Sequence, residues 1–112
     1  MTGDGQALRI APIFPVRDLD RALEFYSRLG FTVRTYAGGG YGFASLGDVE
    51  IHLGLAPAGA AQAGAYLFVD DPDRFARRCQ AAGATVHPPQ DTPWGRHEGV
   101  LLDPDGNTIR FG

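Results

Sequence analysis

The side chains best suited to acid-base chemistry or metal binding near neutral pH are the three histidines of this 112-residue chain. His52 lies in a segment that alternates with apolar residues, His87 precedes two prolines, and His97 is followed directly by Glu98. Neighbouring strand residues point to opposite faces, so His97 and Glu98 do not converge on one site. One isolated imidazole is too little for a catalytic metal site, which needs about three protein ligands.

Residues for nucleophilic chemistry are equally sparse. Ser27 and Ser45 are the only serines, and neither lies in the Gly-x-Ser-x-Gly context of a nucleophile elbow. Cys79, the only cysteine, falls on the predicted inward face of a helix and indicates core packing without any intramolecular disulfide. All ten basic residues are arginines, which excludes Schiff-base lysine chemistry and a Walker-type phosphate site. We therefore predict no catalytic residue.

Composition and charge exclude further classes of protein. A net charge of −3 and a pI near 5.4 argue against non-specific nucleic-acid binding, and an acidic surface favours cationic small molecules. No apolar run approaches the roughly 20 residues that span a bilayer. Residues 1–6 lack the basic and apolar regions of a signal peptide, so we expect a single cytoplasmic domain, 1–112, without membrane contact.

Seven residues of the first half of the chain recur 53 positions later. Two copies of such a long unit indicate a duplicated supersecondary module, with function expected in a pocket of pseudo-twofold symmetry. The identical residues of the first copy are Val16, Asp18, Asp20, Arg21, Gly30, Thr32 and Val33, and those of the second are Val69, Asp71, Asp73, Arg74, Gly83, Thr85 and Val86.

Each copy predicts the order β-α-β-β-β. In the first module, 1–55, Asp18 is the expected helix N-cap and Gly30 the stop, with strands over 8–16, 31–37, 41–46 and 49–53. A flexible linker is expected over 56–63. In the second module, 64–112, Asp71 and Gly83 bound the helix, with strands over 65–69, 84–87, 98–102 and 107–111 and a long loop over 88–97.

Two segments carry a family resemblance. The run from Phe14 to Phe31 and the closing run from Asp103 to Phe111 resemble the vicinal oxygen chelate superfamily, which includes glyoxalase I, extradiol dioxygenases, and fosfomycin and bleomycin resistance proteins. The resemblance implies an α+β fold in which two tandem βαβββ modules form a curved mixed sheet around a concave groove. Both enzymes and binding proteins share this fold, so the site residues must decide the function.

The resemblance also indicates where a metal would bind. The enzymes of this superfamily place a histidine seven residues before the Asp of the strand-to-helix turn, which here gives Ala11 and Gly64. They place a glutamate on the last strand, where this chain has Arg110 after Ile109. Among the expected ligand positions, only His52 has a side chain that could bind a metal. We therefore expect no metal and no cofactor.

Aromatic residues indicate a site that binds a planar ligand by stacking. The stretch Pro93-Trp94-Gly95-Arg96, followed by Glu98, is similar to a loop of bleomycin resistance proteins in which tryptophan stacks on the bithiazole of the drug. Tyr41 lies 53 positions before Trp94, and we interpret the two as equivalent platforms of one groove. The predicted ligand-binding residues are Trp94, Tyr41, Phe31, Phe43, His52, Arg110 and Glu98, with Asp48, Glu50 and Glu98 as rim acids for a cationic tail.

The resemblance therefore implies a metal-free, non-catalytic protein that sequesters a bleomycin-family glycopeptide. It also implies a homodimer with two grooves between its subunits. Two alternatives stay open: a metal-dependent lyase, isomerase or dioxygenase that recruits His52, and a binder of another planar antibiotic.

Overall fold

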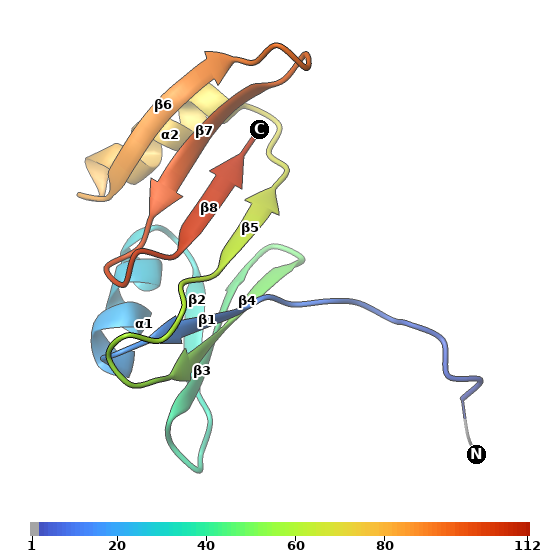
Figure 1. The fold of residues 1–112 in the computed structure, drawn as a ribbon, viewed down its shortest axis with the longest axis vertical. Helices are drawn as coiled ribbons and strands as arrows, with labels where there is room; N and C mark the ends of the chain where they lie inside the picture. Colours follow the sequence, from blue (N-terminus) through green and yellow to red (C-terminus); the bar gives the residue numbers. More distant parts are fainter. Residues whose placement is uncertain (1–2) are drawn as a thin grey trace.

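The structure is a computed structural model that describes residues 3–112. Its fold is an α+β arrangement of two successive modules (Figure 1). Both modules have the predicted βαβββ order, so the expected fold class is confirmed. The first contains β1 (Ile13–Val16), α1 (Leu19–Arg28), β2 (Thr32–Thr35), β3 (Tyr41–Leu46) and β4 (Val49–Leu55). The second contains β5 (Gly64–Leu67), α2 (Pro72–Ala81), β6 (Thr85–Asp91), β7 (His97–Leu102) and β8 (Thr108–Phe111).

Each module builds its own four-stranded mixed sheet. The strand orders are β1-β4-β3-β2 and β5-β8-β7-β6, so the two sheets share one topology. In both, the first strand pairs in parallel with the last, and the other pairs are antiparallel. Neither helix among residues 3–112 has the length and apolar character needed to cross a membrane.

The repeated residues mark the ends of the helices. The carboxylates of Asp18 and Asp71 each accept a hydrogen bond from the backbone N–H three residues later, at 3.0 and 3.1 Å. These bonds satisfy donors that the first turn of a helix leaves free. Gly30 and Gly83 follow the helices with φ angles of 101° and 89°, a conformation that favours glycine. The same start and stop signals therefore produce the same helix twice.

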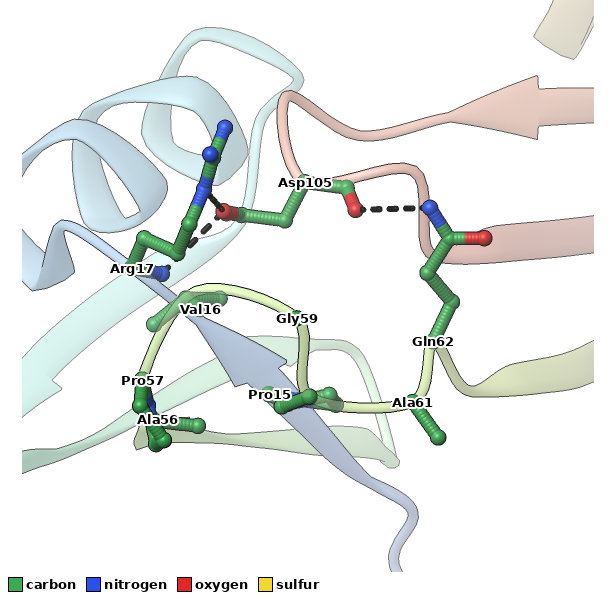
Figure 2. Close-up of a pocket in the computed structure, with 10 residues that line it drawn as sticks. Pro15, Val16, Arg17, Ala56, Pro57, Gly59, Ala61, Gln62 and Asp105 are labelled. Carbon is green, nitrogen blue, oxygen red and sulfur yellow. Dashed lines mark hydrogen bonds and ion pairs between the residues drawn. The ribbon is translucent and has the colours of Figure 1, made fainter.

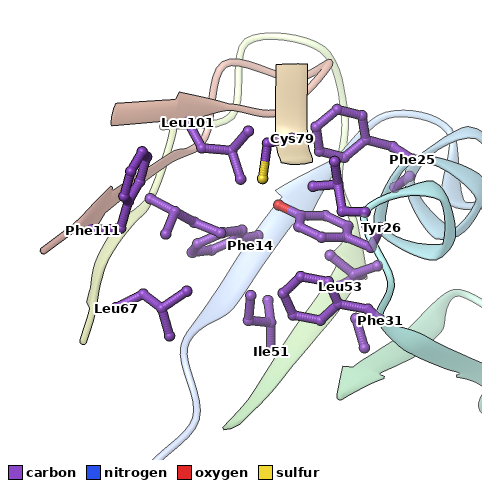
Figure 3. Packing of buried hydrophobic residues seen from close by; sticks show 14 of the residues in the cluster. Phe14, Phe25, Tyr26, Phe31, Ile51, Leu53, Leu67, Cys79, Leu101 and Phe111 are labelled. Atoms are coloured by element: carbon purple, nitrogen blue, oxygen red, sulfur yellow. The ribbon is translucent and has the colours of Figure 1, made fainter. Parts of the chain in front are cut away.

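One continuous apolar core joins the modules. Figure 3 shows Phe14 of β1 between Tyr26 and Leu53 of the first module and Leu101 and Phe111 of the second. All five side chains are buried, and both helices pack against the inner faces of their sheets. The two halves of the chain thus depend on each other for burial.

The first strand is shorter than predicted. Pairing of β1 with β4 starts at Ile13 opposite His52, and residues 3–10 form no strand and are exposed. Figure 1 shows this N-terminal arm, residues 3–12, projecting from the body of the fold, and the end of the arm contacts β4, where the backbone N–H of His52 donates to the Pro12 carbonyl at 2.9 Å. Among residues 3–112, no strand pairs with residues 8–12, so the predicted strand does not extend over them.

The loop predicted over residues 88–97 is shorter in the structure. Strand β6 continues through Pro88 and Pro89 to Asp91, with a register shift between His87 and Gln90. Proline has no backbone N–H to donate to a neighbouring strand. Because β6 lies at the edge of its sheet and has an irregular register, Pro88 and Pro89 interrupt no hydrogen bonds in the centre of the sheet. Only residues 92–96 separate β6 from β7.

We expect Phe14→Ala to lower the free energy of unfolding by about 3–5 kcal/mol, because it leaves a cavity where the two modules meet. Phe14→Leu, which retains most of the volume, should cost less than about 1.5 kcal/mol. Urea denaturation of the three proteins at one protein concentration measures both values. Equal stability of the alanine variant and the wild type would show that this contact does not join the modules.

Candidate functional site

Each sheet turns one side toward its helix and the other side away from the core. In β3, Gly42 and Ala44 are buried, whereas Tyr41 and Phe43 alternate with them on the opposite side. We call these sides the outer faces. The first outer face carries Arg34, Tyr41, Phe43, Glu50 and His52, and the second carries Tyr66, Phe68, Arg96, Glu98 and Arg110.

Three rings form an aromatic cluster on the first outer face. The ring centres of Tyr41, Phe43 and His52 lie 5.0–5.6 Å apart in edge-to-face pairs. The Tyr41 hydroxyl lies 2.8 Å from His52 Nδ1, and His52 Nε2 lies 3.1 Å from Glu50. Because the carboxylate can only accept, Nε2 donates to Glu50 and Nδ1 accepts from Tyr41. This chain of bonds fixes the orientation of both rings.

Glu50 lies beside this cluster on the first outer face, where donors surround its carboxylate. It accepts from Arg9 Nη1 at 2.9 Å, from His52 at 3.1 Å and from Ser45 Oγ at 3.4 Å, and Arg34 Nη2 lies 3.6 Å away. The hydrogen bond from His52, followed by that from Arg9, lowers the pKa of Glu50. The carboxylate is therefore charged but already paired.

The second outer face combines aromatic rings with guanidinium groups. The rings of Tyr66 and Phe68 lie 4.9 Å apart, and Arg96 lies 5.6 and 5.3 Å from their centres. The Tyr66 hydroxyl donates to Glu98 at 2.7 Å and accepts from Arg96 at 3.3 Å. Arg110 lies 3.9 Å from the same carboxylate. Phe68 is 74% exposed, so this face presents an aromatic surface to solvent.

A cavity of about 480 Å³ lies between the N-terminal arm, the start of β4 and β5. The N-terminal arm forms one wall with Ile10, Ala11 and Pro12, while Glu50 and Tyr66 are among the residues from the two sheets. The volume is in the range of small-molecule sites. This cavity and the two outer faces make up the candidate site.

The positions where the related enzymes carry metal ligands do not fit a metal here. Ala11 and Gly64 lack donor side chains, and Arg110 places an exposed cation at the third position. His52 has both ring nitrogens engaged, with Tyr41 and Glu50. Among residues 3–112, no three His, Cys, Asp or Glu side chains gather as a metal site would require.

The predicted equivalence of Tyr41 and Trp94 is wrong. Val33 pairs with Ala44 in the first sheet, and its equivalent Val86 pairs with Leu101 in the second. Equivalent residues are thus 53 positions apart in β2 and β6 but 57 apart in β3 and β7. The extension of β6 introduces this difference.

Glu98 therefore occupies the place that corresponds to Tyr41. Trp94 lies in the turn between β6 and β7, 67% exposed. Figure 1 shows this turn at the top of the molecule and the start of β3 near the bottom. Within one chain the two aromatic side chains do not share a groove.

Phe31 was predicted as a groove wall, and the structure corrects this. It is buried in the core, where its ring centre lies 5.4 Å from that of Tyr26 (Figure 3). Phe43, by contrast, lies on the outer face, with the Arg34 guanidinium carbon 3.9 Å from its ring centre. Asp48 is exposed in the turn between β3 and β4.

Sequence reasoning missed Tyr66, Phe68 and Arg34. The signal for the first two was present, because Tyr66 and Phe68 alternate with Leu67 and Val69 in the period of a strand. Arg34 gave no signal, since nothing in its own segment indicates that it packs on Phe43. Its position follows from the pairing of β2 with β3.

His97, which sequence reasoning set aside, connects secondary-structure elements. Its Nε2 lies 2.9 Å from Asp73 in the first turn of α2, and its Nδ1 lies 2.8 Å from Asp91 at the end of β6. The hydrogen bond to Asp73, followed by that to Asp91, raises the pKa of His97. This residue joins α2 to the β6–β7 hairpin.

A second pocket, of about 420 Å³, lies under the linker between the modules (Figure 2). Asp105 Oδ1 accepts from the backbone N–H of Arg17 and from Arg21 Nη2, both at 3.1 Å, and Gln62 donates to the Asp105 carbonyl at 3.3 Å. These polar contacts connect parts of the protein to one another. The pocket therefore belongs to the junction between the modules.

The chain matches the model of the Glyoxalase/Bleomycin resistance protein/Dioxygenase superfamily over residues 8–111. It belongs to this superfamily. A bleomycin resistance protein of Klebsiella pneumoniae is 32% identical, with 89% of this chain and 87% of that protein covered. A bleomycin resistance determinant encoded on the transposon Tn5 has a similar structure, with a TM-score of 0.84 and 28% identity over 94% of this chain and 96% of that one. A bleomycin-binding protein complexed with bleomycin gives 0.83 and 28% over 94% and 97%.

We expect the pKa of Glu50 to lie below its ordinary value of 4.5 and to rise toward that value in His52→Leu, which removes the main donor. Arg9→Gln should raise it less. Since the pKa is lowered in the folded state, this stabilisation is present above 4.5 and is lost as the pH falls through the folded pKa. Titration of the side-chain carboxyl carbon by NMR gives these values. No rise in the leucine variant would contradict the assignment of His52 as the main cause.

Proposed function

We propose that this protein binds a bleomycin-family glycopeptide, performs no chemistry on it, and confers resistance by sequestering the drug. The observation that carries the proposal is the set of aromatic side chains on the outer faces, at a site whose residues do not fit the metal of the related enzymes. The relative from Klebsiella pneumoniae is named a bleomycin resistance protein, and one structural relative is complexed with bleomycin. We keep the expected cytoplasmic location in the proposal, because the drug must be intercepted before it reaches DNA.

Stacking explains how such a site holds a flat ligand. An aromatic pair contributes roughly 0.5–1.5 kcal/mol beyond the burial of apolar area. We propose Trp94, Tyr41 and Phe43 as stacking platforms, with His52, Glu98 and Arg110 lining the groove. Trp94 is largely exposed, so it has surface available for a ligand.

A homodimer would complete the groove. Leu8 and Ile10 on the N-terminal arm are 92% and 95% exposed, and Ile13 follows them on the same segment. Such apolar residues on an extended arm favour contact with a second copy. Two copies related by a twofold axis would also allow the first outer face of one chain to lie against the second outer face of the other. Tyr41 and Trp94, which are far apart in one chain, would then reach the same ligand.

Calorimetric titration of the full chain with bleomycin tests the proposal. We expect saturable binding with one site per chain. A dissociation constant weaker than about 1 mM, roughly −4 kcal/mol, would exclude sequestration. A tightly bound divalent ion in stoichiometric amount, found in protein purified without chelators, would instead favour a metal-dependent enzyme.

We expect Trp94→Ala to weaken bleomycin binding about tenfold, on the order of 1.4 kcal/mol, because it removes the largest stacking surface. Trp94→Phe keeps a ring at the same place and should retain most of the affinity. The same titration measures both variants. Unchanged affinity in the alanine variant would remove Trp94 from the site.

We expect Ile10→Asp to shift the protein from dimer to monomer, because a charge then replaces an apolar residue at the interface. Gln6→Asp is the matched control, since it adds the same charge to a polar, exposed position of the same arm. Light scattering during size-exclusion chromatography gives the mass of each. A monomeric wild type, or an aspartate variant that stays dimeric, would contradict the role of the arm.

A further inference from the structure

The exposed Trp94 lies in a turn at the end of a hairpin that extends past β8 (Figure 1). Pairing of β7 with β8 starts at Gly99, two residues after β7 begins at His97. A register shift also interrupts the pairing of β6 with β7 just before Gln90. The sheet therefore gives this turn little support, and side-chain contacts must help to fix its direction.

The turn itself, residues 92–96, is closed by its own hydrogen bonds. The Thr92 N–H donates to the Arg96 carbonyl at 2.7 Å, and the Arg96 N–H donates to Thr92 Oγ1 at 3.0 Å. The Gly95 N–H donates to the Thr92 carbonyl at 3.1 Å, and Pro93 restricts the backbone just before Trp94. The turn therefore moves as a unit, and its direction depends on the residues at its two ends.

His97 holds these ends from the helix side of the sheet. Its Nε2 lies 2.9 Å from Asp73 of α2, and its Nδ1 lies 2.8 Å from Asp91 at the end of β6. Leu101, which shares its side of β7 by the strand period of two, is buried in the core, whereas Glu98 lies on the second outer face. The ring of His97 thus faces away from the outer face and can influence a ligand there only through the turn.

This bridge requires a proton on each ring nitrogen of His97. Asp73 and Asp91 face the ring, and a carboxylate only accepts, so both nitrogens must donate. The chain neighbours Arg96 and Glu98 interact on the second outer face. The hydrogen bond to Asp73, followed by that to Asp91, raises the pKa of His97. Since this pKa is raised in the folded state, the bridge is complete below pH 6.5 and is broken as the pH rises through the folded pKa.

The first module repeats only part of this arrangement. Asp20 is the equivalent of Asp73, in the first turn of α1. The residue equivalent to His97 is Gly40, 57 positions earlier, and it has no side chain with which to bridge. The bridge thus belongs to the module whose turn carries Trp94.

We propose that protonated His97 is a positioning residue for Trp94: its bridge to the two aspartates holds the turn in the direction in which the indole meets a planar ligand, and loss of the proton weakens binding. The part of this inference that concerns the ligand rests on the proposed function. The part that concerns the turn does not, because a less restrained turn lets the indole move faster in the ligand-free protein as well.

Time-resolved fluorescence anisotropy of the only tryptophan, measured on the ligand-free full chain from about pH 5.5 to about pH 9, follows the motion of the turn. We expect the anisotropy to fall as the pH rises, with a midpoint equal to the pKa of His97 from NMR titration of the same protein. Asp73→Asn removes one charged partner and should move this midpoint to lower pH. Asp20→Asn, at the equivalent position of α1, is the matched control and should leave the midpoint unchanged. The absence of such a step, or a midpoint that Asp73→Asn does not lower, would overturn the inference.

Calorimetric titration with bleomycin, at one pH below this midpoint and one above it, measures the effect on binding. We expect His97→Gln, which cannot carry the charge, to weaken binding at least about threefold at the lower pH and to match the wild type at the higher pH. His87→Gln, which replaces another exposed histidine of the same hairpin, is the matched control and should match the wild type at both. Comparison of the proteins at one pH cancels any titration of the drug itself.

An equal effect of His97→Gln at both pH values, or no effect at either, would overturn the inference while leaving the proposed function intact. Failure of bleomycin to bind any of these proteins would reject the proposed function. The anisotropy of the ligand-free protein still decides in that case whether His97 positions Trp94. Thermal melting checks that every variant is folded.

Discussion

A polar turn, residues 103–107, whose first and last side chains are buried, holds the two modules in one arrangement. Asp103 accepts from the Tyr26 hydroxyl at 3.1 Å, and the Asn107 side chain donates to the Pro15 carbonyl and accepts from the backbone of Ala63, both at 2.9 Å. Asp103 and Asn107 are almost fully buried, and burial raises the pKa of Asp103. Because buried polar groups without partners are costly, these bonds can be made together in only one packing of β1, α1, the linker and β8. The position of the two outer faces depends on that packing.

Local signals in the sequence account for the helices and for most strands. Asp18 and Gly30 each act through neighbouring backbone atoms, so their effect is readable without the fold. The ends of β1 and β6 could not be predicted in this way. The start of β1 is set by where β4 provides a partner, and β6 runs through Pro88 and Pro89 because it lies at an edge. Such limits depend on residues distant in the sequence.

The residues of the candidate site also fall into two groups: those that a local pattern predicts and those whose place depends on distant parts of the chain. Alternation along β3 is enough to place Tyr41 and Phe43 on one face, but alternation does not distinguish the buried Phe31 from a groove wall. The repeat spacing holds only as far as β2 and β6, so it failed for the pair Tyr41 and Trp94, because β6 is longer than β2. The partners of the Glu50 and Glu98 carboxylates could not be predicted either, because they come from different strands and from the arm.

Stacking of a planar drug on exposed aromatic side chains can be tested directly at Trp94, because it is the only tryptophan. Its emission can be followed during titration with bleomycin beside a calorimetric measurement on the same protein. We expect saturable quenching and a blue shift of the emission, with the same dissociation constant as calorimetry. Binding detected by calorimetry with no change in tryptophan emission would contradict it.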